Sequence, residues 1–97
     1  MTKMTDDERE ALIQRVFDAH GFVPGKTTHP TVIREIGANL RAEFDRAGAR
    51  WDEIGQFAAR FIHDWRRHPN LTSDQCLRTC QAFCDGYGLD VDVTQLL

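Results

Sequence analysis

One amphipathic stretch in the middle of the chain constrains the fold most, because large apolar residues recur there at helical spacing. A helix turns by about 100° per residue, so these residues share one arc of its surface while polar residues take the other side. Such an arc must be covered by the rest of the fold, by a second copy of the chain or by a partner. The arc consists of Trp51, Ile54, Phe57, Ala58, Phe61, Ile62 and Trp65, with Gly55 at its margin.

Helix start and stop signals organise the rest of the chain. Capping-box patterns at 5–8 and 72–75 each open a helix. Pro30 suits a first helical turn, Gly48 ends a helix, and Pro69 prevents the aromatic helix from running past the residue before it. The predicted helices span about 6–20, 30–47, 50–67 and 73–86, followed by a tail at 88–97.

These elements predict a single all-α domain over residues 1–97, as a compact four-helix bundle or orthogonal array with a short extended C-terminal tail. The short connection at 47–50 predicts an antiparallel hairpin of the second and third helices. Gly37 interrupts the second helix, and we expect it to face a large side chain, such as a tryptophan, at a close crossing. The alternation at 89–93 predicts a short strand, or an extended arm followed by a helical turn at 94–97.

Composition and charge describe an ordinary globular chain. Hydrophobic residues make up 41% and charged residues 28% of the sequence, and no apolar run is long enough to cross a bilayer. The N-terminus turns acidic at once and resembles no secretion signal, so cytoplasmic residence without membrane contact is expected. Acidic ends around an arginine-bearing centre favour a protein partner over a polyanion.

Cys76, Cys80 and Cys84 are the only cysteines, and they are spaced four apart on one helix. The first and third are separated by about 12 Å along such a helix, so one metal ion cannot bind all three. We expect them to pack as small apolar residues, with no metal and no cofactor. A thiol or metal-dependent enzyme assembled from distant residues is the least favoured interpretation, because no catalytic motif is present.

A nucleic-acid-binding regulator is the main alternative. The second and third predicted helices with their short turn resemble a helix-turn-helix, in which Arg50, Arg60, Arg66 and Arg67 would contact phosphates. The formal net charge of −3, and acidic residues at the start of the third helix, argue against this interpretation.

The sequence therefore predicts a small non-catalytic interaction protein that binds another protein as an inhibitor, anti-activator or adaptor does. Homodimerisation through the aromatic helix or the C-terminal arm is the expected assembly. The predicted interface consists of Trp51, Phe57, Phe61 and Trp65 on the helix, with Leu89, Val91 and Val93 on the arm.

Overall fold

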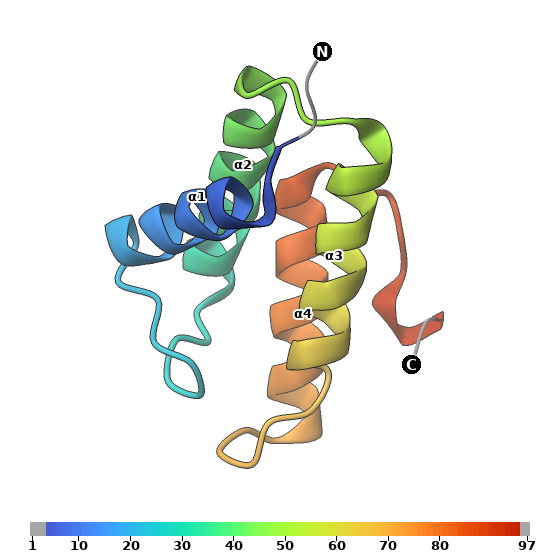
Figure 1. The fold of residues 1–97 in the computed structure, drawn as a ribbon. Helices are drawn as coiled ribbons and strands as arrows, with labels where there is room; N and C mark the ends of the chain where they lie inside the picture. Colours follow the sequence, from blue (N-terminus) through green and yellow to red (C-terminus); the bar gives the residue numbers. More distant parts are fainter. Residues whose placement is uncertain (1–3, 96–97) are drawn as a thin grey trace.

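The structure, a computed structural model, describes residues 4–95. Four helices and a final helical turn follow one another along this part of the chain (Figure 1). The all-α architecture predicted from the sequence is confirmed, and no helix within residues 4–95 is both long and apolar enough to span a membrane. The elements are α1 (Asp6–Ala19), α2 (Pro30–Arg46), α3 (Trp51–Trp65), α4 (Ser73–Tyr87) and η1 (Val93–Gln95).

Both predicted capping boxes are formed. At the start of α1, the Glu8 amide donates to the Thr5 hydroxyl at 3.1 Å, and the Thr5 amide donates to the Glu8 carboxylate at 3.1 Å. At the start of α4, Thr72 and Gln75 make the same reciprocal pair, at 2.9 and 3.1 Å. Local side chains thus satisfy amides that have no partner within the helix, and they explain why sequence located these two starts to the residue.

The helices pack differently from the predicted hairpin. The main neighbour of α2 is α4, not α3, although α2 and α3 do run in opposite directions (Figure 1). Two glycines allow this: a Cβ on Gly37 would lie 2.6 Å from the carbonyl oxygen of Phe83, and one on Gly86 would lie 1.9 Å from that of Arg34. Gly37 therefore faces the main chain of α4, and the expected tryptophan contact is wrong. Between α2 and α3, the rings of Phe44 and Phe57 fill the space at 5.6 Å between centroids.

The core is built around stacked aromatic rings from α3 and α4. Phe61 stacks on Phe83 with centroids 3.9 Å apart, and Phe83 stacks on Tyr87 at 5.0 Å. The Tyr87 hydroxyl donates to the carbonyl oxygen of Ile54 at 2.8 Å, which satisfies its one buried polar group. Burial raises the pKa of Tyr87 well above its usual range. Most of the apolar arc of α3 is thus buried in the core of the chain itself.

The C-terminal tail leaves α4 at Gly88, whose φ of 83° is the left-handed conformation that ends the helix. It then runs back beside α3 (Figure 1), and Val93 anchors it with 1% of its surface exposed. No strand forms in residues 4–95, so the predicted strand is wrong and the extended-arm alternative is correct. The helical turn is a 3-10 turn at Val93–Gln95, and the predicted continuation to 97 lies outside the described residues.

Candidate protein-binding groove

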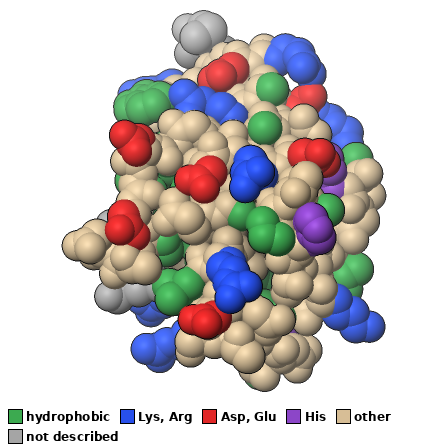
Figure 2. Space-filling model, turned by 180° about the vertical axis from the view of Figure 1, so that it is seen from behind, with side chains coloured by type: hydrophobic (Ala, Val, Ile, Leu, Met, Phe, Trp, Pro, Cys, Tyr) green, Lys and Arg blue, Asp and Glu red, His purple; other side chains and the backbone are tan. Residues whose placement is uncertain are grey.

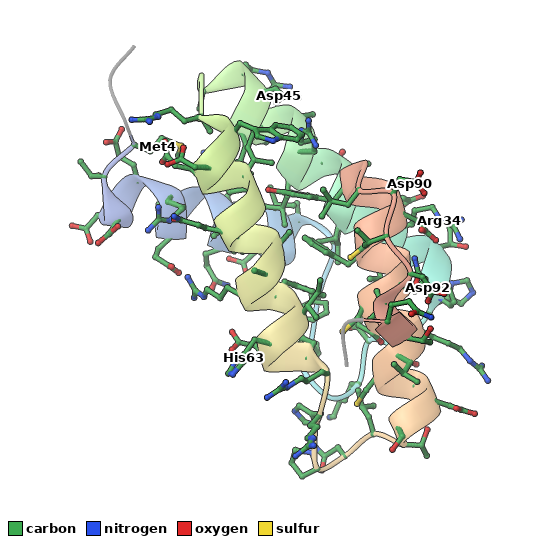
Figure 3. The ribbon with its side chains drawn as sticks, turned by 90° about the vertical axis from the view of Figure 1, so that its right-hand side faces the viewer. Met4, Arg34, Asp45, His63, Asp90 and Asp92 are labelled. Carbon is green, nitrogen blue, oxygen red and sulfur yellow. The ribbon has the colours of Figure 1, made fainter. Side chains whose placement is uncertain are left out.

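An apolar groove lies between the outer face of α3 and the C-terminal tail. Its volume is about 440 Å³. Figure 3 views the molecule from this side, with His63 on α3 at one edge and Asp90 and Asp92 on the tail at the other. Small side chains on α3 form the floor, and apolar side chains of the tail form the opposite wall. The lining residues are Gly55, Ala58, Ala59, Ile62 and His63 from α3, Arg66 directly after its end, and Leu89 and Val91 from the tail.

Besides the buried Val93, the Gln81 side chain on α4 holds the tail in place. The Gln81 amide nitrogen donates to the carbonyl oxygen of Val91 at 2.9 Å, and its amide oxygen accepts from the Val93 amide at 2.9 Å. A side-chain amide therefore gives the tail the pair of hydrogen bonds that a neighbouring strand would otherwise provide. Leu89, which precedes this clamped segment, and Val91, which begins it, line the groove opposite α3.

Replacing Gln81 by alanine is expected to loosen the tail while leaving the helices folded. The two lost hydrogen bonds contribute about 1 kcal/mol each, which together are enough to raise local opening of residues 89–95 by about tenfold or more. Hydrogen exchange measured by mass spectrometry on the C-terminal peptide tests this. Gln14→Ala is the matched control, since Gln14 is exposed on α1 and bonds only to Asp18. Unchanged exchange in the tail of the Gln81 variant would contradict the clamp.

The end of the groove nearest the C-terminus of α3 is positively charged. Arg66 lines both the groove and an adjoining pocket of about 280 Å³, where Arg67, Leu77 and Thr94 are further lining residues. Among the described residues, no carboxylate lies within 4.0 Å of Arg66 or Arg67, whereas most other arginines have such a partner. Two guanidinium groups whose hydrogen-bond donors are not used by a carboxylate of the described residues thus adjoin an apolar surface, and such an arrangement is suited to binding a carboxylate.

The other end of the same helix face carries Trp51, one turn before Gly55. Trp51 is 68% exposed, the largest exposure of any large apolar side chain in residues 4–95. The Arg41 guanidinium lies 4.9 Å from the indole centroid and donates to the carbonyl oxygen of Tyr87 at 3.0 Å. The indole is therefore supported on one face and open to solvent on the other, as interface-anchoring tryptophans are in free proteins.

The predicted interface residues separate into two groups. Trp51 and Val91 are exposed, and Leu89 and Trp65 are half-buried, Trp65 packing against Phe61, Phe22 and His68. The remaining three residues belong to the core of the subunit, so their assignment to an interface is wrong: a side chain that packs inside one fold has no surface left for a partner. These residues are Phe57 at 6% exposure, Phe61 at 3% and Val93 at 1%.

Sequence reasoning missed the floor of the groove. Ala59 and Ile62 lie on the groove side of the arc, and Gly55 lies at its margin. The available signal was a run of small residues beside large ones on one helix face. That signal gained meaning only once the tail was seen to form the opposite wall.

The four arginines of the nucleic-acid alternative do not form one surface. Arg60 pairs with Glu10 at 2.5 Å and Asp64 at 3.8 Å, and it lines a different pocket from Arg66 and Arg67. Arg50 lies 3.4 Å from Asp52 at the start of α3. On the face opposite to that of Figure 1, basic and acidic side chains are interspersed rather than gathered by sign (Figure 2). Phosphate binding depends on clustered positive charge, so this arrangement does not favour it.

The cysteines are buried and line the inner face of α4. Cys76, Cys80 and Cys84 are each at most 1% exposed. Burial raises the pKa of Cys80 to about 12 and that of Cys84 to about 11, so neither forms appreciable thiolate at neutral pH. No group of three or more metal-binding side chains comes together within residues 4–95.

A buried carboxylate lies on the opposite side of α3 from the groove. The Glu53 side chain is 1% exposed; one oxygen accepts from the Arg50 amide at 3.3 Å. Its other oxygen has no hydrogen-bond partner in the part of the chain that the structure describes, and it lies 3.9 Å from the Arg9 guanidinium, beside a pocket of about 140 Å³. This group helps to start α3 and to attach α1, with space for water between the charges.

Comparison with known proteins adds no further assignment. No protein-family model, curated protein or solved structure matches this chain.

Proposed function

We propose that the protein is a non-catalytic binding protein, of the inhibitor or adaptor kind, that takes a segment of another protein into the groove between α3 and the tail. The observation that carries this proposal is the apolar groove of about 440 Å³ with Arg66 at one end, whose guanidinium group has no carboxylate within 4.0 Å among residues 4–95. Its site of action is the cytoplasm, because the reducing conditions of that compartment keep cysteines such as these three in the free thiol form.

The shape and lining of the groove indicate the chemistry of the segment. Alkyl side chains form the walls of the groove, whereas the floor carries only glycine and alanine. An apolar ridge on the bound segment can therefore approach the backbone of α3 closely. Arg66 and Arg67 then select a carboxylate at the end of that ridge. An amphipathic helix with an acidic residue beside its apolar face has both features.

The polar groups of the groove suit recognition rather than reaction. They are one exposed imidazole, His63, and one guanidinium, Arg66, among alkyl side chains. The buried thiols face the core rather than the groove. Binding through a rim cation and a desolvated apolar centre matches the general anatomy of protein interfaces.

Site-specific photo-crosslinking in the producing cells tests the proposal. A photoreactive amino acid at Ala59 is expected to capture a partner protein, whereas the same group at Ala38 is not. Both residues are exposed helical alanines, and Ala38 lies on α2, outside the groove. Ala59→Arg is expected to abolish the captured complex, and Ala38→Arg to preserve it. Equal capture of the partner from both positions, or an unchanged yield of the complex with Ala59→Arg, would contradict the groove as the binding site.

Arg66→Glu is expected to weaken the same complex about tenfold or more, because it replaces an attraction for the partner's carboxylate by a repulsion. Arg78→Glu is the control: Arg78 is exposed on α4 and lies outside the groove and its adjoining pocket. Quantifying the partner that co-purifies with each variant measures the difference. Equal losses for both variants would indicate a general charge effect rather than recognition.

A further inference from the structure

We infer that a second copy of this chain covers the groove when no other partner is bound, with the two α3 helices packed antiparallel. The inference rests on the proposed function in one respect, namely that the groove is a docking surface. It adds a specific occupant and a specific register. It also implies that a partner must compete with self-association.

The register follows from the positions of small and large side chains along the face. When two copies cross antiparallel between positions 58 and 59, the exposed Ala59 of each copy lies near the centre, and Gly55 of each copy lies opposite Ile62 of the other. Ala58, at 2% exposure, is part of the core and contributes only the edge of this face. A Cβ on Gly55 would have no described residue beyond its own stretch of helix within 4 Å, so the space beside it is open. Ile62 is half-buried and lines the groove. Each copy thus offers one ridge and one matching gap.

The charges support the same register. Extending it outward places Trp51 and Asp52 of one copy opposite Arg66 of the other. Trp51 has an open indole face, and Arg66 has no carboxylate partner among the described residues. Within one chain, Asp52 and Arg66 are about 21 Å apart along the helix axis, so they cannot pair with each other. On the exposed face of α3, the Asp52 carboxylate, which lies 3.4 Å from Arg50 of its own chain, is at the start of the helix, and the Arg66 guanidinium directly follows its end.

A parallel pairing lacks these features. It would place Arg66 against Arg66 and leave Gly55 facing Gly55, with repulsion at one end and a void in the middle. The antiparallel arrangement joins opposite charges at both ends and fills both gaps. A twofold axis through the crossing makes the two ends equivalent, as in most homodimers.

A charge exchange tests the inference directly. Asp52→Arg and Arg66→Glu are each expected to raise the dimer dissociation constant at least tenfold in sedimentation equilibrium at low salt. The double variant is expected to return to within about threefold of the parent, since only an antiparallel pairing between copies brings the exchanged groups together. Circular dichroism confirms that each variant remains helical. A parent chain that is monomeric at high micromolar concentration, or a double variant no better than the singles, would overturn the inference.

Filling the gap provides a second measurement. Gly55→Leu is expected to abolish the dimer without lowering the midpoint of thermal unfolding of the dilute monomer, because the position is open. A dimer that persists in this variant would overturn the register.

The photo-crosslinker at Ala59 separates the two proposals. Crosslinks between two copies support the inference. Crosslinks to another protein, together with a free chain that never dimerises, overturn the inference and leave the proposed function intact.

Discussion

Gly86→Ala is expected to destabilise the protein by about 3 kcal/mol or more, a large part of the stability of a domain of this size. The added methyl would lie 1.9 Å from the carbonyl oxygen of Arg34, and the contacted atom belongs to the backbone of α2. A backbone atom cannot rotate away as a side chain can, so α2 and α4 must separate. Their crossing is the most extensive helix contact of the structure. Chemical denaturation followed by circular dichroism measures the loss.

The same substitution at Gly55 is the matched control, and its expected effect has the opposite sign. Gly55 is helical and exposed, and within residues 4–95 the added methyl would meet nothing within 4 Å beyond its own stretch of helix. Alanine in an open helical position stabilises by up to about 1 kcal/mol, because the unfolded chain loses conformational freedom. Equal effects of Gly55→Ala and Gly86→Ala would mean that helix propensity, rather than the close crossing, determines the outcome.

Phe61→Ala is expected to lower the free energy of unfolding by about 3–5 kcal/mol, the cost of emptying a well-packed aromatic site. The side chain is 3% exposed, and its ring stacks on Phe83 at 3.9 Å and packs near Phe57 and Trp65. These neighbours come from two helices, so removal of the ring leaves a cavity that none of them can fill alone. Urea denaturation gives the free energy, and an unchanged denaturant dependence shows that the same surface still unfolds.

Trp51→Ala is the control for this variant, because Trp51 belongs to the same apolar arc of the same helix. Its exposure of 68% leaves little burial to lose, and the contact with Arg41 contributes about 1 kcal/mol or less. We therefore expect a loss below about 1 kcal/mol in the monomer. A loss as large as that of Phe61→Ala would show that the indole packs against the subunit in solution.

Helix positions were predicted from sequence because their causes are local. A capping box joins residues three apart, and its two hydrogen bonds form whatever the rest of the chain does. The predicted starts at 6, 30 and 73 are confirmed. The third helix is shorter than predicted: it ends at Trp65 rather than at 67.

Helix pairing was not predicted, because it depends on residues far apart in the sequence. Gly37 signalled a close crossing, but nothing local to it indicated Gly86 as the counterpart. The short connection had suggested that α2 packs against α3, but α2 instead makes its large contact with α4.

By itself, the sequence determined four helices, their caps and an aromatic face on the third, since periodicity and capping act between near neighbours. That Phe61 is buried in the core while Trp51 remains exposed follows from the tertiary packing alone. The tertiary structure also decided the path of the tail, which Gln81 holds beside α3 from ten residues away. The physical reason is that burial and grooves are properties of two surfaces together, whereas a sequence pattern describes one surface at a time.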